Sequence, residues 1–188
     1  MALSTGHTIA CSDRNRRGGI KAIYLAELTS IDTAQIVNTD QSYDNFPTNS
    51  GNFFHKFEFE RETAGFTANA TKENGSTVVE VELDFIIPKI TKEVQKALES
   101  LKETCGVVAM VETFADDGSG NTYHFVLGYD QIFTTEAYLD FASGEQASGV
   151  AIQDANQTAV KLSARQAEYP YEYGGNIALV SGTEYTTT

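Results

Sequence analysis

Residues 76–87 read STVVEVELDFII, and apolar side chains occupy every second position along most of this stretch. These apolar residues share one face of an extended chain: Val79, Val81, Leu83, Phe85 and Ile87. The opposite face carries three carboxylates, those of Glu80, Glu82 and Asp84. A period of two is typical of a strand that buries one face and exposes the other. The stretch therefore predicts a long strand in a sheet with one solvated face.

A second alternating stretch, NFFHKFEFE, spans residues 52–60. One face would carry Phe53, His55, Phe57 and Phe59, and the other Phe54, Lys56, Glu58 and Glu60. The first of these faces is aromatic and the second is largely charged. We predict a long strand here that pairs with residues 76–87 in the same sheet.

Beyond Pro88 the spacing of apolar residues changes from two to three or four. The apolar positions are Ile90, Val94, Ala97, Leu98, Leu101 and Cys105. This spacing forms one stripe of an amphipathic helix. Thr91 can cap the first turn, and Gly106 can adopt the left-handed conformation after the last turn. The sequence predicts one principal helix over about residues 91–104.

Shorter extended runs indicate further strands between turn-forming residues. These strands are expected at residues 20–28, 66–71, 106–115, 122–129, 158–169 and 177–180. The glycine-rich DDGSGN joins 106–115 to 122–129 and predicts a β-hairpin. Residues 136–157 have no steady period and are expected to form a long surface loop, and the terminal GTEYTTT is expected to fray.

These elements predict an α+β, mainly β fold: a sandwich or barrel of about eight antiparallel strands with one principal helix. A chain of 188 residues is long enough to bury a sizeable core. Because the chain has no internal repeat or linker, we expect residues 1–188 to form a single domain. Residues 1–19 would be an N-terminal arm that leads into the first strand.

The charge of the chain is strongly negative. With 13 basic and 26 acidic residues, the net charge is −13. Residues 1–21 hold four basic side chains and one acid, a local charge of +3, which leaves −16 on the remainder. Affinity for nucleic acid comes largely from neutralised phosphates, so we expect no binding of DNA or RNA over the whole surface. A polyanion could still pass such a surface without adhering to it.

Cysteine usage and hydropathy indicate the environment of the protein. Cys11 and Cys105 are 94 positions apart and belong to no zinc or disulfide pattern, so a reducing compartment is expected. The first residues lack the basic and apolar segments of a secretory signal. No window reaches the roughly 18 consecutive apolar residues of a membrane span. We therefore expect a soluble protein that is made in the cytoplasm.

Sequence motifs for chemistry are weak. In RRGGIK, residues 16–21, the glycines precede a strand, whereas a phosphate-binding loop lies between a strand and a helix. In DDGSGN, residues 116–121, glycine stands where a calcium loop needs its third ligand. The three histidines are far apart, and Ser163 does not lie in a GxSxG turn. We predict no catalytic, cofactor or metal site, and a protein that is not an enzyme.

The stretch CSDRNRRGGIKAIYLAEL, residues 11–28, resembles the start of virion proteins from tailed bacteriophages of the Bacteroidetes and marine type. The order of the expected elements is similar to that of the tail tube family: long amphipathic strands, one helix, a hairpin and closing strands. The resemblance implies a homo-hexameric ring whose strands join into a β-barrel around a channel. Stacked rings would form a tube in the virion, assembled in the host cytoplasm, through which DNA passes without specific binding.

The resemblance also implies roles for particular side chains. Channel-lining residues would come from one of two sets: Glu80, Glu82 and Asp84, or Lys56, Glu58 and Glu60. The opposite faces of these strands would pack against the helix stripe formed by Val94, Leu98 and Leu101. The N-terminal arm, through Arg14, Arg16 and Arg17, and the loop at 136–157 would contact the next ring.

The implied partners are further copies of the chain, other tail proteins and the passing DNA, with no membrane and no cofactor. Two alternatives stay open. One is another virion component of related fold, such as a tail completion or neck protein. The other, from a different class, is a monomeric ligand-binding β-domain or small enzyme.

Overall fold

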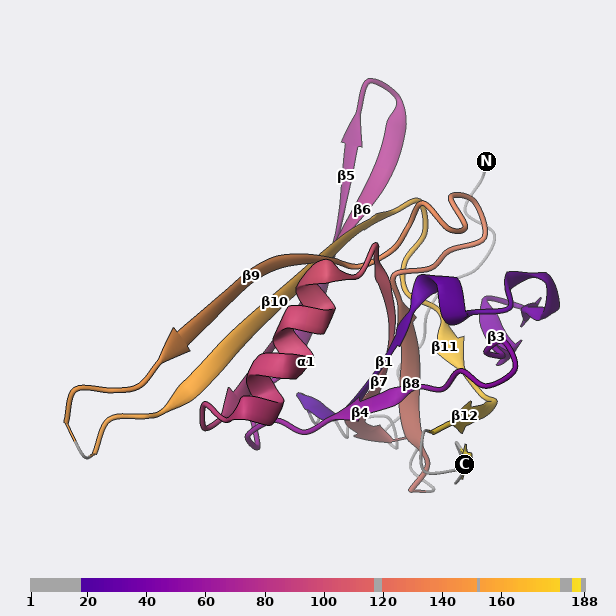
Figure 1. Cartoon of the computed structure of the whole chain (residues 1–188). Helices are drawn as coiled ribbons and strands as arrows, with labels where there is room; N and C mark the ends of the chain where they lie inside the picture. Colours follow the sequence, from indigo (N-terminus) through magenta and orange to yellow (C-terminus); the bar gives the residue numbers. More distant parts are fainter. Residues whose placement is uncertain (1–17, 117–119, 152, 180–183, 187–188) are drawn as a thin grey trace.

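The two alternating stretches lie in different β-sheets of the protein. The computed structural model describes residues 18–116, 120–151, 153–179 and 184–186 (Figure 1). The described residues contain thirteen strands, one α-helix and two short 3-10 helices at Leu28–Ser30 and Thr33–Gln35. The α+β, mainly β class is therefore confirmed, and the number of strands is higher than the eight expected.

The first sheet has four antiparallel strands in the order β5-β6-β10-β9. Its strands are β5 (Gly65–Glu73), β6 (Ser76–Pro88), β10 (Gln157–Gln166) and β9 (Asp140–Ala147). On β6, Leu83 lies opposite Phe66 of β5 and Leu162 of β10. The alternating apolar side chains of β6 from Val79 to Phe85 are at most 2% exposed. The prediction of a half-buried strand at residues 76–87 is therefore confirmed.

The second sheet has seven strands in the order β2-β3-β11-β8-β7-β1-β4. Its strands are β1 (Ile20–Glu27), β2 (Val37–Thr39), β3 (Ser42–Asn45), β4 (His55–Phe57), β7 (Val107–Asp116), β8 (Thr122–Leu127) and β11 (Glu172–Tyr173). The expected first strand and the expected hairpin are confirmed as β1 and as β7 with β8. The expectation of antiparallel strands alone is wrong at one pair, because β11 runs parallel to β3.

Two apolar clusters form the core, one on each face of the seven-stranded sheet. The first cluster lies between the two sheets and includes Ile23, Leu83 and Leu162. The second cluster lies on the other face and includes Tyr24 and Phe46. Neighbouring residues of β1 thus point into different clusters, so this strand is buried on both faces. That double burial explains the nearly continuous apolar run of its sequence.

The helix α1 (Lys92–Glu103) confirms the prediction for residues 91–104. Thr91 caps it, because its side-chain oxygen accepts a hydrogen bond from the Val94 backbone N–H. Leu101 is buried in the first cluster, and Val94 and Leu98 pack against that cluster. These three residues form the expected stripe, which holds the helix beside the four-stranded sheet.

The prediction for residues 52–60 is wrong in length and partner, and its facing is wrong at Phe53 and Phe54. The strand is only β4, and it pairs with β1 instead of β6, with Phe57 opposite Ile23. Beyond β4 the chain crosses to the other sheet, where the Glu60 N–H donates to the Ile86 carbonyl. Phe57 and Phe59 pack against the core while Glu58 and Glu60 are exposed, as expected. Phe54 is 1% exposed and Phe53 is 36% exposed, the reverse of the expected facing. The alternation was regular, but a change of sheet interrupts the pairing.

Two segments expected to be irregular contain strands. Residues 140–147 of the expected loop at 136–157 form β9, which pairs with β10. Within the tail GTEYTTT, Glu184–Thr186 form β13, which pairs with β12 (Asn176–Ala178). Most side chains of β9 are exposed, so no apolar period marked it in the sequence. Backbone pairing with an already well-formed neighbour is what makes this segment a strand.

Candidate functional site

The outward face of the four-stranded sheet brings charged side chains together from β6 and β10. The Arg165 guanidinium lies 3.3 Å from the Glu80 carboxylate, and the Lys161 ammonium lies 2.9 Å from that of Glu82. Asp84 lies opposite Lys161 in the register of the two strands. The three carboxylates expected on one solvated face are thus on one face, and two of them are paired with cations from the next strand.

This outward face keeps a negative balance. The register of β9 with β10 places Asp140 opposite Ser163 and Glu145 opposite Ala159, on the same face. Five carboxylates of β6 and β9 therefore share the face with the two cations of β10, Lys161 and Arg165. The pKa of Lys161 is raised, mainly because its ammonium donates a hydrogen bond to Glu82. The negative charge of Asp84 adds to this effect. The sequence did not predict these cations at the site, although their spacing of four in β10 places both on one face.

The same sheet has two long edges. Its outermost strands are β5, with nine residues, and β9, with eight. Among the described residues no strand pairs with the outer edge of either one. Figure 1 shows the β5–β6 hairpin projecting upward from the body and the β9–β10 hairpin projecting to the left. These edges present unpaired backbone N–H and C=O groups that can pair with another chain.

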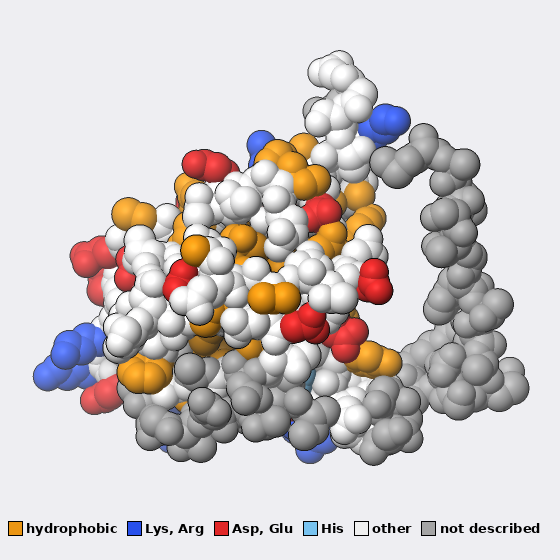
Figure 2. Space-filling model, turned by 90° about the vertical axis from the view of Figure 1, so that its right-hand side faces the viewer, with side chains coloured by type: hydrophobic (Ala, Val, Ile, Leu, Met, Phe, Trp, Pro, Cys, Tyr) orange, Lys and Arg blue, Asp and Glu red, His pale blue; other side chains and the backbone are white. Residues whose placement is uncertain are grey.

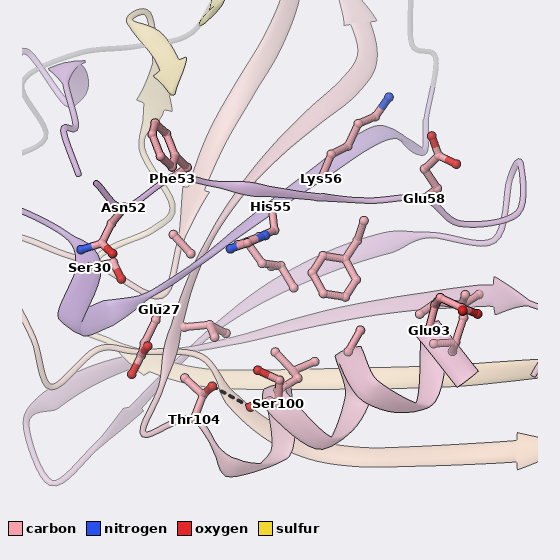
Figure 3. Close-up of a pocket in the computed structure, with 18 of the residues that line it drawn as sticks. Glu27, Ser30, Asn52, Phe53, His55, Lys56, Glu58, Glu93, Ser100 and Thr104 are labelled. Atoms are coloured by element: carbon pink, nitrogen blue, oxygen red, sulfur yellow. Dashed lines mark hydrogen bonds between the residues drawn. The ribbon is translucent and has the colours of Figure 1, made fainter. Parts of the chain in front are cut away.

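The second proposed channel set lies elsewhere. Lys56 and Glu58 lie at or beside β4, on the edge of the seven-stranded sheet, and Glu60 follows them toward β6. Lys56 and Glu58 line a groove between β4 and α1 (Figure 3). The structure therefore separates the two candidate sets, and only Glu80, Glu82 and Asp84 share the outward face of the four-stranded sheet.

The groove between β4 and α1 has a volume of about 840 Å³. Its apolar lining comes from several elements: Leu25 and Ala26 of β1, Phe53 and Phe57 at β4, Ile87 of β6, Val107 of β7, and Val94, Ala97 and Leu101 of α1. Three carboxylates, those of Glu27, Glu58 and Glu93, also line it. It is thus a groove with an apolar floor and acidic side chains along its margin.

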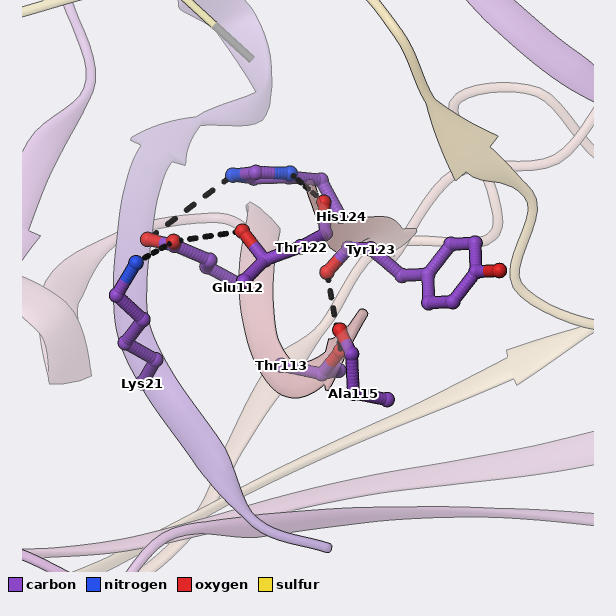
Figure 4. Close-up of polar contacts among 7 residues, drawn as sticks. All are labelled: Lys21, Glu112, Thr113, Ala115, Thr122, Tyr123 and His124. Atoms are coloured by element: carbon purple, nitrogen blue, oxygen red, sulfur yellow. Dashed lines mark hydrogen bonds and ion pairs between the residues drawn. The ribbon is translucent and has the colours of Figure 1, made fainter. Parts of the chain in front are cut away.

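A buried polar network lies at the other end of β1. Lys21 forms an ion pair with Glu112, which also accepts a hydrogen bond from the Thr122 hydroxyl at 2.8 Å (Figure 4). His124 Nε2 lies 4.0 Å from the second Glu112 oxygen, and its Nδ1 lies 3.0 Å from the Thr122 carbonyl oxygen. Glu112 and His124 are each 1% exposed. These contacts connect β1, β7 and β8 and compensate the burial of the Glu112 charge.

Burial lowers the pKa of His124, although the neighbouring Glu112 acts in the opposite direction. The histidine therefore favours its neutral form. With the Nδ1 proton directed at the Thr122 carbonyl, a neutral ring turns its unprotonated Nε2 toward Glu112. This arrangement links strands and holds a proton-sensitive group inside the fold.

The remaining predicted features are the arginines of the N-terminal arm, metal sites, membrane-spanning segments and the cysteines. Arg14, Arg16 and Arg17 of the N-terminal arm lie outside the described residues. Within the described ranges, no three His, Cys, Asp or Glu side chains are grouped so that they could hold a metal ion. In the same ranges no helix has the length and apolar character needed to cross a membrane. Cys105 is exposed at the end of α1.

Comparisons of the chain with protein families, with curated proteins and with solved structures found no match. The acidic character is widely spread: Figure 2 shows Asp and Glu side chains scattered over one face, with Lys and Arg at its margins. Among the described residues, the four-stranded sheet and the β4–α1 groove each combine charge with an open edge or groove.

Proposed function

We propose that this protein is a structural subunit of a bacteriophage tail tube. In this proposal six copies form a ring around a channel, and rings stack into a tube within the virion. The resemblance of residues 11–28 to the start of phage virion proteins suggests the family. The observation that carries the proposal is the pair of long edges, β5 and β9, on opposite sides of one sheet, which no strand in the described part of the chain covers.

These two edges suit a cyclic assembly. A contact between β5 of one copy and β9 of the next uses different surfaces on the two partners, so it is heterologous. Such a contact closes into a ring when the rotation between neighbours is suitable. Ring closure pairs every edge of the combined sheet, and it removes the aggregation hazard that an exposed strand edge presents.

The outward face of the four-stranded sheet would line the channel. Its five carboxylates outnumber Lys161 and Arg165, so DNA in the channel would meet a negative wall. Repulsion between like charges would keep DNA from adhering as it slides. The cations of β10 reduce the repulsion between the carboxylates themselves. The opposite face of the sheet supplies the apolar core that holds α1, so the helix would lie outside the barrel.

The groove between β4 and α1 favours one second candidate from another class, a monomeric ligand-binding β-domain. Apolar clefts of several hundred Å³ are typical ligand sites. A neck or tail completion protein is the nearer alternative, because it would use the same sheet edges in one ring. The three candidates differ in the assembly that they form.

Negative-stain electron microscopy and native mass spectrometry of the purified full-length protein test the proposal. We expect rings of six copies that stack into tubes as the concentration rises. Rings that do not stack would favour the neck alternative. A protein that stays monomeric at every concentration would overturn the proposal and favour the ligand-binding domain.

A further inference from the structure

The turn between β5 and β6 holds the one Asn-Gly pair of the sequence, Asn74–Gly75. We propose that Asn74 is a site of spontaneous modification, at which its side-chain amide cyclises onto the Gly75 nitrogen and is lost as ammonia, and that one product removes the subunit from assembly. The second part rests on the proposed function, because β5 is one of the two edges of the ring contact.

The turn presents the two residues on a projecting hairpin. β5 ends at Glu73 and β6 begins at Ser76, so Asn74 and Gly75 form the whole loop. Their φ angles are +50° and +84°, as a type I′ turn requires at both central positions. Both residues are exposed, and Figure 1 shows the hairpin extending beyond the body of the protein. Water therefore reaches the reacting atoms.

The Gly75 nitrogen is an accessible nucleophile. The hydrogen bond that closes such a turn is donated by the residue after the two central ones, here Ser76, so the closure does not use the Gly75 N–H. Glycine has no Cβ to obstruct the approach of the asparagine side chain. Asn69 differs on both counts, because it lies within the ladder of β5 and the methyl group of Ala70 follows it.

The reaction needs only water as co-reactant. The Gly75 nitrogen bonds to Cγ of Asn74, and the bond from Cγ to the side-chain nitrogen breaks. Water carries the proton of the Gly75 N–H to the leaving nitrogen, which departs as ammonia, and a five-membered cyclic imide remains. Water then opens this imide. Opening at Cγ gives aspartate with the original backbone, and opening at the backbone carbonyl carbon gives isoaspartate, in which the main chain runs through Cγ.

The two products have different effects on the hairpin. Asp-Gly suits a type I′ turn as well as Asn-Gly does. Isoaspartate adds one CH₂ group to the main chain, so a two-residue loop can no longer hold Glu73 opposite Ser76. The pairs of β5 and β6 next to the turn then separate, and the outer edge of β5 loses the regular ladder that a neighbouring strand needs. Subunits with isoaspartate therefore stay outside rings.

Peptide mapping by mass spectrometry tests the first part. Full-length protein is incubated at mildly alkaline pH and sampled over several days. Trypsin cleaves after Lys72, so Asn69 and Asn74 fall in different peptides. We expect the peptide with Asn74 to gain the mass difference between an amide and an acid, while Asn69 stays an amide. If Asn74 keeps its amide, or reacts no faster than Asn69, the proposal is wrong.

The sorting of partly converted protein tests the second part. The sample is assembled, rings are separated from remaining monomers, and electron-transfer fragmentation distinguishes isoaspartate from aspartate. We expect isoaspartate to be enriched about tenfold in the monomers, since pairs of backbone hydrogen bonds are lost, and aspartate to be distributed evenly. An even distribution of isoaspartate would overturn this part alone. Fresh protein that forms no rings would overturn the proposed function and this part with it, whereas conversion at Asn74 is measured independently.

Asn74→Gly is the matched control, because Gly-Gly also forms a type I′ turn and has no side-chain amide. Incubation should leave its yield of rings unchanged, whereas the wild-type yield should fall as isoaspartate accumulates. Freshly prepared Asn74→Asp has the added charge on a normal backbone and should assemble like fresh wild-type protein. Equal decline of Asn74→Gly and wild type, or a loss of rings in fresh Asn74→Asp, would overturn the role of isoaspartate.

Discussion

Gly128 shows how one residue position sets the contact between neighbouring segments. It directly follows β8 and has a φ of +82°. Next to it, Val107 and Leu139 exchange two backbone hydrogen bonds of 2.9 Å. A Cβ atom at Gly128 would lie 2.7 Å from the Val107 oxygen and 2.8 Å from the Leu139 nitrogen. Glycine is therefore required here for both its backbone conformation and its small size.

Gly75 offers a matched comparison for this position. Its φ is +84°, but a Cβ atom there would meet nothing within 4 Å. Gly75→Ala should lower the free energy of unfolding by about 1–2 kcal/mol, the cost of a left-handed backbone for an L-residue. Gly128→Ala should cost about 1–3 kcal/mol more, because the methyl group also displaces packed backbone. Urea denaturation measures both, and equal losses would contradict the crowding argument.

His124 makes stability depend on pH. Its pKa is lowered by burial, so the folded chain binds fewer protons at this site than the unfolded chain. The free energy of unfolding should then be highest above about pH 6.5 and should decrease as the pH falls below that value. His124→Gln should flatten the decrease between pH 7 and the lowered pKa.

Denaturant titrations at a series of pH values provide the measurement for His124. His55→Gln is the control, because His55 is an exposed histidine of β4. If His124→Gln keeps the same slope as His55→Gln, then His124 does not contribute to the acid sensitivity.

At the scale of elements, β5 and β9 matter because, in the described ranges, each pairs with one neighbouring strand only. β5 pairs with β6 along its full length, from Gly65 opposite Asp84 to Glu73 opposite Ser76. Consecutive residues of an antiparallel edge strand turn their N–H groups alternately toward the neighbour and away from it. Half of the N–H groups of β5 are therefore available to another copy.

Proline substitutions at two consecutive positions of β5 test this edge. Of Asn69→Pro and Ala70→Pro, one removes an N–H that pairs with β6 and should destabilise the monomer. The other removes an outward N–H and should block ring formation while the monomer stays folded. Asn69→Ala and Ala70→Ser keep both N–H groups and serve as controls. Native mass spectrometry and thermal unfolding are the measurements, and rings from both proline variants would contradict a role for this edge.

At the scale of the whole molecule, the two sheets separate the surfaces. The four-stranded sheet presents Glu80, Glu82 and Asp84 outward, and the groove beside β4 lies on the seven-stranded sheet. A subunit arranged in this way can use its strand edges for neighbours within the proposed ring while the outward acidic face stays free to line the channel.

Charge reversal on the channel face should change how assembled rings treat DNA. We expect tubes of Glu80→Lys, Glu82→Lys and Asp84→Lys to retain duplex DNA in a salt-sensitive manner, since cations would then face the phosphates. Retained DNA should be protected from nuclease. Microscopy first establishes that the variant forms tubes. If the Lys variant does not assemble, the neutral variant with Glu80→Gln, Glu82→Gln and Asp84→Asn is used in its place.

The control for the charge reversal is Glu62→Lys with Glu99→Lys and Glu103→Lys. It makes the same charge change on exposed positions away from the channel face. DNA bound by this control should remain accessible to nuclease. Equal protection in both variants, or none in either, would show that β6 does not line the channel.

Local patterns in the sequence predicted β6 and α1 well. Each of these elements buries one face. The burial determines the spacing of apolar residues: every second residue in 76–87, and every third or fourth from Val94 to Leu101. The carboxylates of β6 were placed on one solvated face for the same reason. The class of fold and the outward acidic face were therefore predictable.

Tertiary structure alone decided how these elements are joined. The sequence of residues 52–60 alternates as regularly as β6, yet β4 pairs with β1 in the other sheet, because strand partners depend on contacts between residues distant in the chain. β9 has no apolar period, and its pairing with β10 makes it a strand. Likewise, only the register of β10 against β6 brings Lys161 to Glu82 and Arg165 to Glu80. The spacing of apolar residues in the sequence reflects which face of an element is buried, whereas the pairing of strands is decided only in the folded chain.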